Sequence, residues 1–146
     1  KSALTTDDVT VLISLVGHVQ GAVLYSLSNA TGLALVSRMM SRVFVEFDGL
    51  AQSGIAELGN VITGRASVKL SEAGYEAALS PPTLLIGKGA AISTLDFERL
   101  VVPLNSDYGS VVIHLALRES ADRGPSAAAI TVSARPAVGG SLWSHT

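Results

Sequence analysis

Residues 8–28 read DVTVLISLVGHVQGAVLYSLS, and this stretch is the strongest indication of the fold. It contains two runs rich in β-branched and aliphatic residues, Asp8–Leu15 and Ala22–Ser28, and both are predicted to be strands. The segment between them, Gly17–Gly21, has the composition of a turn, and so short a connection predicts an antiparallel hairpin. Neither run alternates cleanly with polar residues. We therefore expect other elements to cover both faces of the hairpin.

The composition of the chain is that of a folded domain with an apolar core. The chain has 146 residues, of which 48% are hydrophobic and only 15% are charged. This length and apolar content favour one domain with a buried core and argue against disorder. The formal charge of −2 provides no basic surface for nucleic acid or anionic lipid. The sequence contains no cysteine, which excludes disulfide scaffolds and thiolate chemistry.

A long uncharged segment raises the question of a membrane span. Residues 9–37 contain no Asp, Glu, Lys or Arg, but serine, glycine and other polar residues divide them into short apolar runs. We read the segment as buried strands followed by the start of a helix, because a membrane span requires about 20 predominantly apolar residues. No basic segment precedes a signal-like apolar core, so we predict a cytoplasmic protein. The sequence begins with Lys1 rather than Met, and we expect it to be a fragment or a processed form.

Two helices and several strands are predicted after the hairpin. The first helix is capped by Ser28 or Asn29 and extends to about Arg42, and the second extends from near Asp48 to about Leu70. The order of elements predicts an α+β domain, in which a mainly antiparallel sheet carries two long helices. The further strands are predicted at Tyr75–Leu79, Thr83–Ile86, Phe97–Leu104 and Ser110–Leu117, and the last two are predicted to form a second hairpin with its turn at residues 105–109.

Proline and small residues mark the remaining boundaries of the chain. Pro81 and Pro82 suit an edge or a corner of the sheet, because proline cannot donate a backbone hydrogen bond. We assign residues 1–119 to the α+β domain and residues 120–146, rich in Ala, Ser, Gly and Pro, to a low-complexity tail. Within the tail, Ala129–Ala134 can pair as an added strand. Trp143 is either an anchor for a partner or a disordered aromatic residue.

The second predicted helix carries the candidate functional residues. Its sequence from residue 49 to residue 64 is GLAQSGIAELGNVITG. On a wheel of about 100° per residue with Ser53 at zero, Glu57 falls at about 40° and Asn60 at about 340°. One face of the helix therefore presents a carboxylate and a carboxamide, which together accept and donate hydrogen bonds. The opposite side is predicted to be apolar and consists of Ala51, Ile55, Leu58, Val61 and Ile62.

Glycines recur along this helix at Gly49, Gly54, Gly59 and Gly64. An interior glycine costs a helix about 1 kcal/mol relative to alanine, so we infer that these positions permit close approach of another surface. Gly54 and Gly59 are predicted to serve packing within the protein. Gly49 and Gly64 point the same way as the acid and the amide. Together with Ser53, they predict a flat docking strip around those two groups.

The segment Ser53–Asn60 resembles the [Asp/Ser]-x3-Glu-x2-Asn signature of the CheC/CheX/FliY family of chemotaxis phosphatases. Three longer stretches support the resemblance. GLAQSGIAELGNVITG is similar to the family's signature helix, LSPPTLLIG at residues 79–87 to its diproline strand, and ISLVGHVQGAVLYSLS at residues 13–28 to its opening hairpin. These stretches keep the family's order over Asp8–Leu117, which is more specific than the short signature alone.

Only one copy of the signature is present. Residues 31–42 contain no Glu or Asn, so the second site of CheC-type members is missing. This makes the chain most similar to CheX, and the resemblance implies a single-site subunit that acts as a homodimer. Two features depart from the family pattern. Lys1–Thr6 is too short for the helix that usually precedes the first hairpin, and the residues after Glu119 have no counterpart.

The resemblance implies a hydrolase that removes the phosphoryl group from the aspartyl phosphate of a CheY-like response regulator in two-component signalling. By residue match, Asn60 would orient the attacking water, and Glu57 would pair with a lysine of the regulator. Ser53, Gly49 and Gly64 would help the regulator to dock. The Mg²⁺ of the reaction belongs to the regulator, so the resemblance implies no metal or cofactor bound by this chain.

Two other functions fit the same fold. The chain can be a module that binds a receiver domain without hydrolysis, or it can have a structural role, as flagellar switch proteins of related fold do. In the structural role, Glu57 and Asn60 are two ordinary exposed helix residues. The presence of both residues favours the enzyme, and an assay of phosphate release distinguishes the enzyme from the binding module.

The other polar and sulfur-containing residues have simpler explanations. Ser80 precedes two prolines and is predicted to be a turn residue rather than a nucleophile. Met39 and Met40 are predicted to fill the core. The histidines show no paired spacing, so we predict no zinc site. They are His18 in a predicted turn, His114 in a predicted strand and His145 in the tail.

Overall fold

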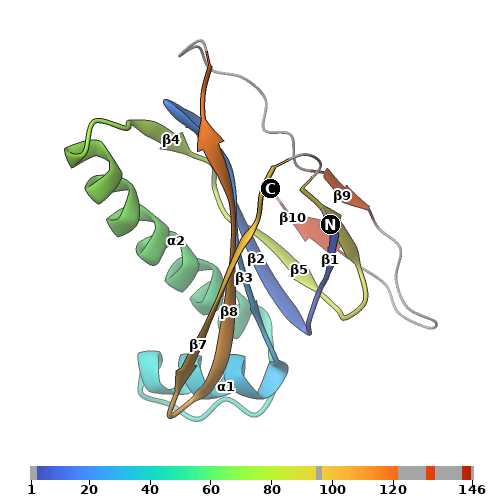
Figure 1. The fold of residues 1–146 in the computed structure, drawn as a ribbon. Coiled ribbons are helices and arrows are strands. Elements are labelled where there is room, and N and C mark those ends of the chain that lie inside the picture. Colours follow the sequence, from blue (N-terminus) through green and yellow to red (C-terminus); the bar gives the residue numbers. More distant parts are fainter. Residues whose placement is uncertain (1–2, 95–96, 122–130, 134–142, 146) are drawn as a thin grey trace.

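The computed structural model describes residues 3–94, 97–121, 131–133 and 143–145 (Figure 1). Within these residues the chain forms two helices and two antiparallel sheets, which confirms the predicted α+β fold. The helices are α1 (Asn29–Met40) and α2 (Gly49–Glu72). The strands are β1 (Ala3–Thr5), β2 (Val9–Gly17), β3 (Val19–Leu27), β4 (Ala77–Leu79), β5 (Thr83–Ile86), β6 (Ala91–Ser93), β7 (Leu100–Ser106), β8 (Gly109–Glu119), β9 (Thr131–Ser133) and β10 (Trp143–His145).

The larger sheet has the strand order β10-β5-β2-β3-β8-β7, and β4 pairs with the end of β2. The smaller sheet has the order β1-β6-β9. Figure 1 shows α2 on one side of the larger sheet and the smaller sheet on the other side. The prediction that both faces of the first hairpin are covered is therefore confirmed. The sequence did not predict β1 and β6, because strands of three residues are too short to show a periodic pattern.

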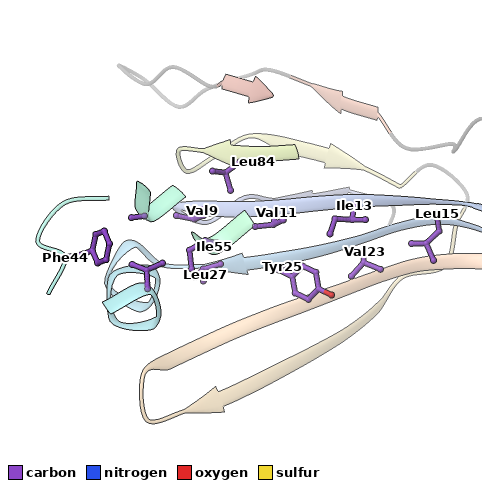
Figure 2. Close-up of a cluster of buried hydrophobic side chains, with 12 residues drawn as sticks. Val9, Val11, Ile13, Leu15, Val23, Tyr25, Leu27, Phe44, Ile55 and Leu84 are labelled. Atoms are coloured by element: carbon purple, nitrogen blue, oxygen red, sulfur yellow. The ribbon is translucent and has the colours of Figure 1, made fainter. Parts of the chain in front are cut away.

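Two clusters of buried side chains hold these layers together. The cluster on the helix side combines alternate residues of β2 and β3 with residues from α1, α2, β5 and the loop between the helices (Figure 2). It comprises Val9, Val11, Ile13, Leu15, Val23, Tyr25, Leu27, Val36, Phe44, Ala51, Ile55 and Leu84. The cluster on the other side, beneath the smaller sheet, comprises Leu4, Leu12, Ala22, Leu24, Leu85 and Ile92.

Both strands of the first hairpin extend beyond their predicted ends, although they pair with each other only as far as Leu15 and Gly21. β2 ends at Gly17 and β3 begins at Val19, so only His18 separates the two strands, and the predicted turn at Gly17–Gly21 is wrong in its extent. The neighbouring strands explain the difference. β4 pairs with the end of β2 and β8 pairs with the start of β3, so the glycine-rich residues are held in the sheet from both sides.

Both helices begin where the sequence predicts. Ser28 caps α1, where its Oγ accepts a hydrogen bond from the backbone N–H of Thr31 at 3.1 Å. Asp48 caps α2, where its Oδ1 accepts from the backbone N–H of Ala51 at 2.9 Å. Such caps satisfy backbone donors that a helix leaves unpaired at its start. Neither helix of the described ranges is long and apolar enough to cross a membrane.

The helix ends differ slightly from the prediction. α1 stops at Met40 rather than at Arg42, because Ser41 adopts a left-handed conformation with φ of 54°. The backbone N–H of Arg42 then donates to the carbonyl oxygen of Ser37 at 3.2 Å and closes the helix. α2 continues beyond its predicted end, to Glu72.

The diproline segment forms a corner, as predicted. β4 and β5 both pair with β2 at different points along it, and Pro81 and Pro82 lie between them. The backbone N–H of Ser80 donates to the carbonyl oxygen of Ser14 at 2.9 Å, and its Oγ accepts from the backbone N–H of Ser14 at 2.9 Å. Ser80 is therefore a turn residue that ties the corner to the central strand.

The second hairpin is present with a tighter turn than predicted. The turn contains Asp107 and Tyr108 alone rather than residues 105–109. The hydroxyl of Ser106 closes it by accepting from the backbone N–H of Tyr108 at 3.1 Å and donating to the carbonyl oxygen of Gly109 at 2.9 Å. As a result, β7 begins and ends later than predicted, and β8 is longer at both ends.

Two short strands lie within residues 120–146, which the sequence predicts to be a tail. β9 falls within the predicted segment Ala129–Ala134 and pairs with β6. β10 contains Trp143 and His145, and it pairs with β5. The region therefore adds one strand to each sheet (Figure 1). The rest of residues 122–142, and the surroundings of the Trp143 side chain, lie outside the described residues.

Candidate functional site

α2 approaches its neighbours closely at two glycines. At Gly54, an ideal Cβ would lie 3.1 Å from Cγ1 of Val36 in α1. At Gly59, an ideal Cβ would lie 3.0 Å from Cγ1 of Val11 in β2 and 3.4 Å from Cδ2 of Tyr25 in β3. These spacings are tighter than ordinary contacts, so a larger residue at either position would push the helix away. The predicted packing role of both glycines is confirmed.

The buried face of α2 is rotated relative to the prediction. The sequence predicts Val61 and Ile62 on the buried side, but they are 44% and 41% exposed. A wheel treats all apolar residues alike, whereas the glycines determine which side of the helix can come close to the sheet. The residues of α2 that are buried are Ala51, Gly54, Ile55, Gly59 and Thr63.

Glu57 and Asn60 lie on the outer face of α2. Glu57 is exposed and Asn60 is half-buried. They are three positions apart along the helix, which places them about 60° apart around its axis and within one turn of each other. No hydrogen bond or ion pair to another described residue engages either side chain. Both groups are therefore available to a molecule outside the protein.

The surface around this pair is smooth. Ser53 is exposed one turn before Glu57. At Gly49 and Gly64, no atom of the described residues outside the local helix lies within 4 Å of an ideal Cβ, so each position is open to the surroundings. Gly49, Ser53, Glu57, Asn60 and Gly64 together form what we call the signature strip.

An apolar edge runs along one side of the signature strip. Leu50, Val61 and Val68 are 47%, 44% and 57% exposed. On the same wheel they fall at about 60° to 80°, next to Glu57. The strip therefore joins a polar centre to an apolar flank, an arrangement typical of protein-binding surfaces.

A pair of buried hydroxyl groups lies on the sheet side of α2. The phenol oxygen of Tyr25 is 2.7 Å from Oγ1 of Thr63, and Oγ1 of Thr63 donates to the carbonyl oxygen of Gly59 at 2.8 Å. Burial raises the pKa of Tyr25, and its hydrogen bond with Thr63 partly opposes this effect. The sequence alone did not predict this pair. Its signal was a threonine among the residues that face the sheet.

An apolar cavity of about 200 Å³ lies beside α2. It extends from α2 to the second hairpin, where Leu104, Val111 and Ile113 line it. Leu58 and Ile62 line it on the side of α2, and this explains how Ile62 is both apolar and partly exposed.

The histidines outside the signature strip have structural surroundings. His18 is half-buried rather than free at the surface, and its Nδ1 accepts from the backbone N–H of Glu76 at 3.1 Å. His114 is half-buried in β8, as expected for a packed strand residue. Burial lowers the pKa of His114, and the nearby positive charge of Arg99 lowers it further. Among the described residues, no group of three or more His, Asp or Glu is placed to hold a metal ion.

The prediction for the two methionines is half correct. Met40 is partly buried and packs against the helix-side core. Met39 is 43% exposed and does not fill the core. The residues are adjacent on α1, so they point in directions about 100° apart, and only one of them can face the sheet.

Comparison with known proteins agrees with this fold. Residues 9–105 match the sequence profile of a family described as chemotaxis phosphatase CheX. The CheY-P phosphatase CheX of Thermotoga maritima is 36% identical over 84 residues, which are 57% of this chain and 54% of the relative. The chain thus spans about half the length of this curated relative.

Solved structures show the same arrangement of helices and sheets. A CheC-like superfamily protein from Shewanella sp. PV-4 superposes with a TM-score of 0.72 and 28% identity, over 81% of this chain and 78% of that one. A chain of the CheX–CheY–BeF3–Mg²⁺ complex from Borrelia burgdorferi superposes with a TM-score of 0.63 and 25% identity, over 76% of each. Because the family profile also covers well over half of the sequence, the chain belongs to the CheX family of chemotaxis phosphatases.

Proposed function

We propose that this chain removes the phosphoryl group from the aspartyl phosphate of a CheY-like receiver domain. The observation that carries the proposal is the exposed pair on α2, a carboxylate at Glu57 and a carboxamide at Asn60 without partners among the described residues. Two comparisons support it. The relative from Thermotoga maritima is a CheY-P phosphatase, and the similar structure from Borrelia burgdorferi is a complex of CheX with CheY.

In the proposed reaction, a water molecule attacks the phosphorus atom in line with the aspartyl oxygen. The bond between phosphorus and that oxygen breaks, which yields inorganic phosphate and a free aspartate carboxylate. Phosphoryl transfer of this kind passes through a loose transition state, so placement of the water matters more than a strong base. Asn60 holds the water, because its amide both donates and accepts hydrogen bonds.

The remaining groups of the signature strip serve docking in this proposal. Glu57 pairs with a lysine of the receiver, which fixes the register of the two proteins. Ser53, Gly49 and Gly64 admit the receiver surface without steric obstruction. The Mg²⁺ of the reaction belongs to the receiver, so this chain contributes side chains and no metal. We place the encounter in the cytoplasm.

The test is a time course of phosphate release. A receiver domain is phosphorylated with acetyl phosphate and then separated from the remaining acetyl phosphate. The release of inorganic phosphate is measured over time with and without this chain. Faster release supports the proposed function. Binding of the BeF3-loaded receiver without faster release would instead identify a non-catalytic binding module. Absence of both binding and acceleration would leave a structural role, as in flagellar switch proteins.

Glu57→Gln is expected to weaken docking and to slow release. The variant keeps the size of the side chain but removes the charge, and charge-assisted hydrogen bonds contribute about 1.5–3 kcal/mol. We expect Kd for the BeF3-loaded receiver to rise by about 10-fold or more, as measured by titration calorimetry. Glu72→Gln, at the other end of α2, is the matched control. Unchanged binding by Glu57→Gln would contradict the proposed lysine pair.

We also propose that the chain forms a homodimer through β7. This strand is at one edge of the larger sheet in the described part of the chain, and Leu100, Val101 and Leu104 are 61%, 46% and 50% exposed. An edge strand has unpaired backbone groups that can pair with a second copy. Leu104 also lines the apolar cavity, so pairing at β7 would shield its rim.

A double substitution at this edge tests the homodimer. Val101→Lys with Leu104→Lys is expected to convert a dimer into a monomer, because charges on an edge strand oppose pairing. Sedimentation at micromolar concentration measures the change. Val43→Lys, at a residue that is 81% exposed in the loop between the helices, is the control and should remain dimeric. A monomeric wild-type protein at that concentration would exclude the proposed dimer.

A further inference from the structure

We propose that Tyr25 and Thr63 are positioning residues, which fix the rotation of α2 and thereby the direction of the Asn60 amide. This inference rests on the proposed phosphatase function. Tyr25 belongs to β3 at the centre of the larger sheet, and Thr63 lies in α2, 38 residues later in the sequence. Their hydrogen bond therefore joins the helix to the sheet at the level of the signature strip.

The hydroxyl groups form a directed chain. Oγ1 of Thr63 donates its single proton to the carbonyl oxygen of Gly59, so the phenol of Tyr25 must donate to Thr63. The Gly59 carbonyl carbon is bonded to the backbone nitrogen of Asn60. The chain of hydrogen bonds thus ends on the peptide group that precedes the proposed water-holding residue.

Packing supports the same placement. Tyr25 is 6% exposed and Thr63 is 2% exposed, so both hydroxyls are largely shielded from bulk solvent. An ideal Cβ at Gly59 would lie 3.4 Å from Cδ2 of the Tyr25 ring, which brings the helix backbone directly onto that ring. The ring and the hydroxyl of Tyr25 therefore both constrain the same turn of the helix. The ring does so by packing against it, and the hydroxyl does so through a directional hydrogen bond.

Small rotations of α2 matter for the proposed reaction. A side chain tip lies about 6 Å from the helix axis, so a rotation of about 10° moves it by about 1 Å. A misplacement of this size can reduce a catalysed rate by about 100-fold. The sheet-side hydrogen bond opposes such a rotation at a point one turn from Asn60.

Single-atom changes test the inference. Tyr25→Phe and Thr63→Val each remove the hydrogen bond while keeping the shape of the side chain. We expect kcat for phosphate release to fall by about 10-fold, with KM changed by less than about two-fold. Thr63→Ser keeps the hydroxyl and should restore most of kcat. The double variant should be no slower than the slower single variant, because both remove one shared interaction.

The chain offers a matched control for these variants. Oγ1 of Thr10 in β2 is buried and has no hydrogen-bond partner among the described residues, and Thr10 is 0% exposed. Thr10→Val therefore removes a buried hydroxyl without breaking a bond, and kcat should stay at the wild-type value. If Tyr25→Phe and Thr63→Val lower the melting temperature but leave kcat unchanged, the pair is merely structural and the inference is wrong.

A spectroscopic measurement separates this inference from the proposed function. In the free protein, the side-chain amide resonances of Asn60 should shift in Tyr25→Phe and Thr63→Val and stay in place in Thr10→Val. Unchanged resonances in the first two variants would overturn the inference whether or not the wild-type chain is active. An inactive wild-type chain with shifted resonances would overturn the phosphatase proposal and retain the positioning of Asn60.

Discussion

Replacing Asn60 with alanine should reduce the acceleration of phosphate release from a phosphorylated receiver domain by at least about 100-fold. The Asn60 amide is proposed to hold the attacking water in line with the leaving oxygen, and alanine has no group that can do so. Glu57 and the rest of the signature strip remain in place. Binding of the BeF3-loaded receiver should therefore change by less than about three-fold, which corresponds to about 0.65 kcal/mol.

Gln52→Ala is the matched control for this experiment. Gln52 carries the same carboxamide on the same helix, but its Nε2 donates to the carbonyl oxygen of Phe47 at 3.1 Å. Its loss should leave the release rate near the wild-type value. Circular dichroism checks that both variants keep the fold. An Asn60→Ala protein with the wild-type rate would remove the proposed water-holding role, and a parallel loss of binding would assign Asn60 to docking instead.

A second large effect is expected for Gly21→Val, and it concerns stability. Gly21 lies in β3 with φ of +139°, a conformation that other residues rarely adopt. An ideal Cβ at this position would overlap the carbonyl oxygen of Ala116 in β8. The obstacle is backbone in the middle of the sheet, so it cannot rotate away as a side chain would. We expect the free energy of unfolding to fall by about 3–5 kcal/mol.

This loss is comparable to the whole stability of many small domains, so Gly21→Val should unfold near room temperature or fail to fold. Urea unfolding monitored by circular dichroism measures it. Gly64→Ala provides the contrast, because in the described part of the chain no atom outside the local helix lies within 4 Å of an ideal Cβ there. Alanine at this helical position should stabilise the protein by up to about 1 kcal/mol. A Gly21→Val protein that unfolds at the wild-type urea concentration would contradict the argument.

Local patterns in the sequence predicted the main elements of the fold. The β-branched runs of the first hairpin, the caps Ser28 and Asp48 and the diproline corner depend on neighbouring residues alone, and each lies where it was expected. The exposed placement of Glu57 also follows from helical spacing. Its role, and that of Asn60, stay predictions until the assays are made.

Features that depend on distant contacts were not predictable from the sequence. The turn at His18 is short because β4 and β8, which lie far along the chain, pair with the ends of the hairpin. Val61 is exposed because Gly59 faces the sheet at close range and thereby turns Val61 outward. A helical wheel contains no information about contacts with other elements. The bond between Tyr25 and Thr63 joins residues 38 positions apart and becomes visible only when the helix lies on the sheet.

The seating of α2 at Gly54 and Gly59 has a consequence for recognition. A helix that packs this closely against both α1 and the sheet cannot move toward either of them without a clash, so in the proposed complex it would meet the receiver with little rearrangement. Association then loses little conformational entropy on this side of the complex. Any conformational change on association would then occur mainly in the partner protein. In the proposed complex, a receiver domain that is not phosphorylated would meet the same rigid surface, so discrimination between the two states of the receiver would rest on that rigidity rather than on mutual adjustment.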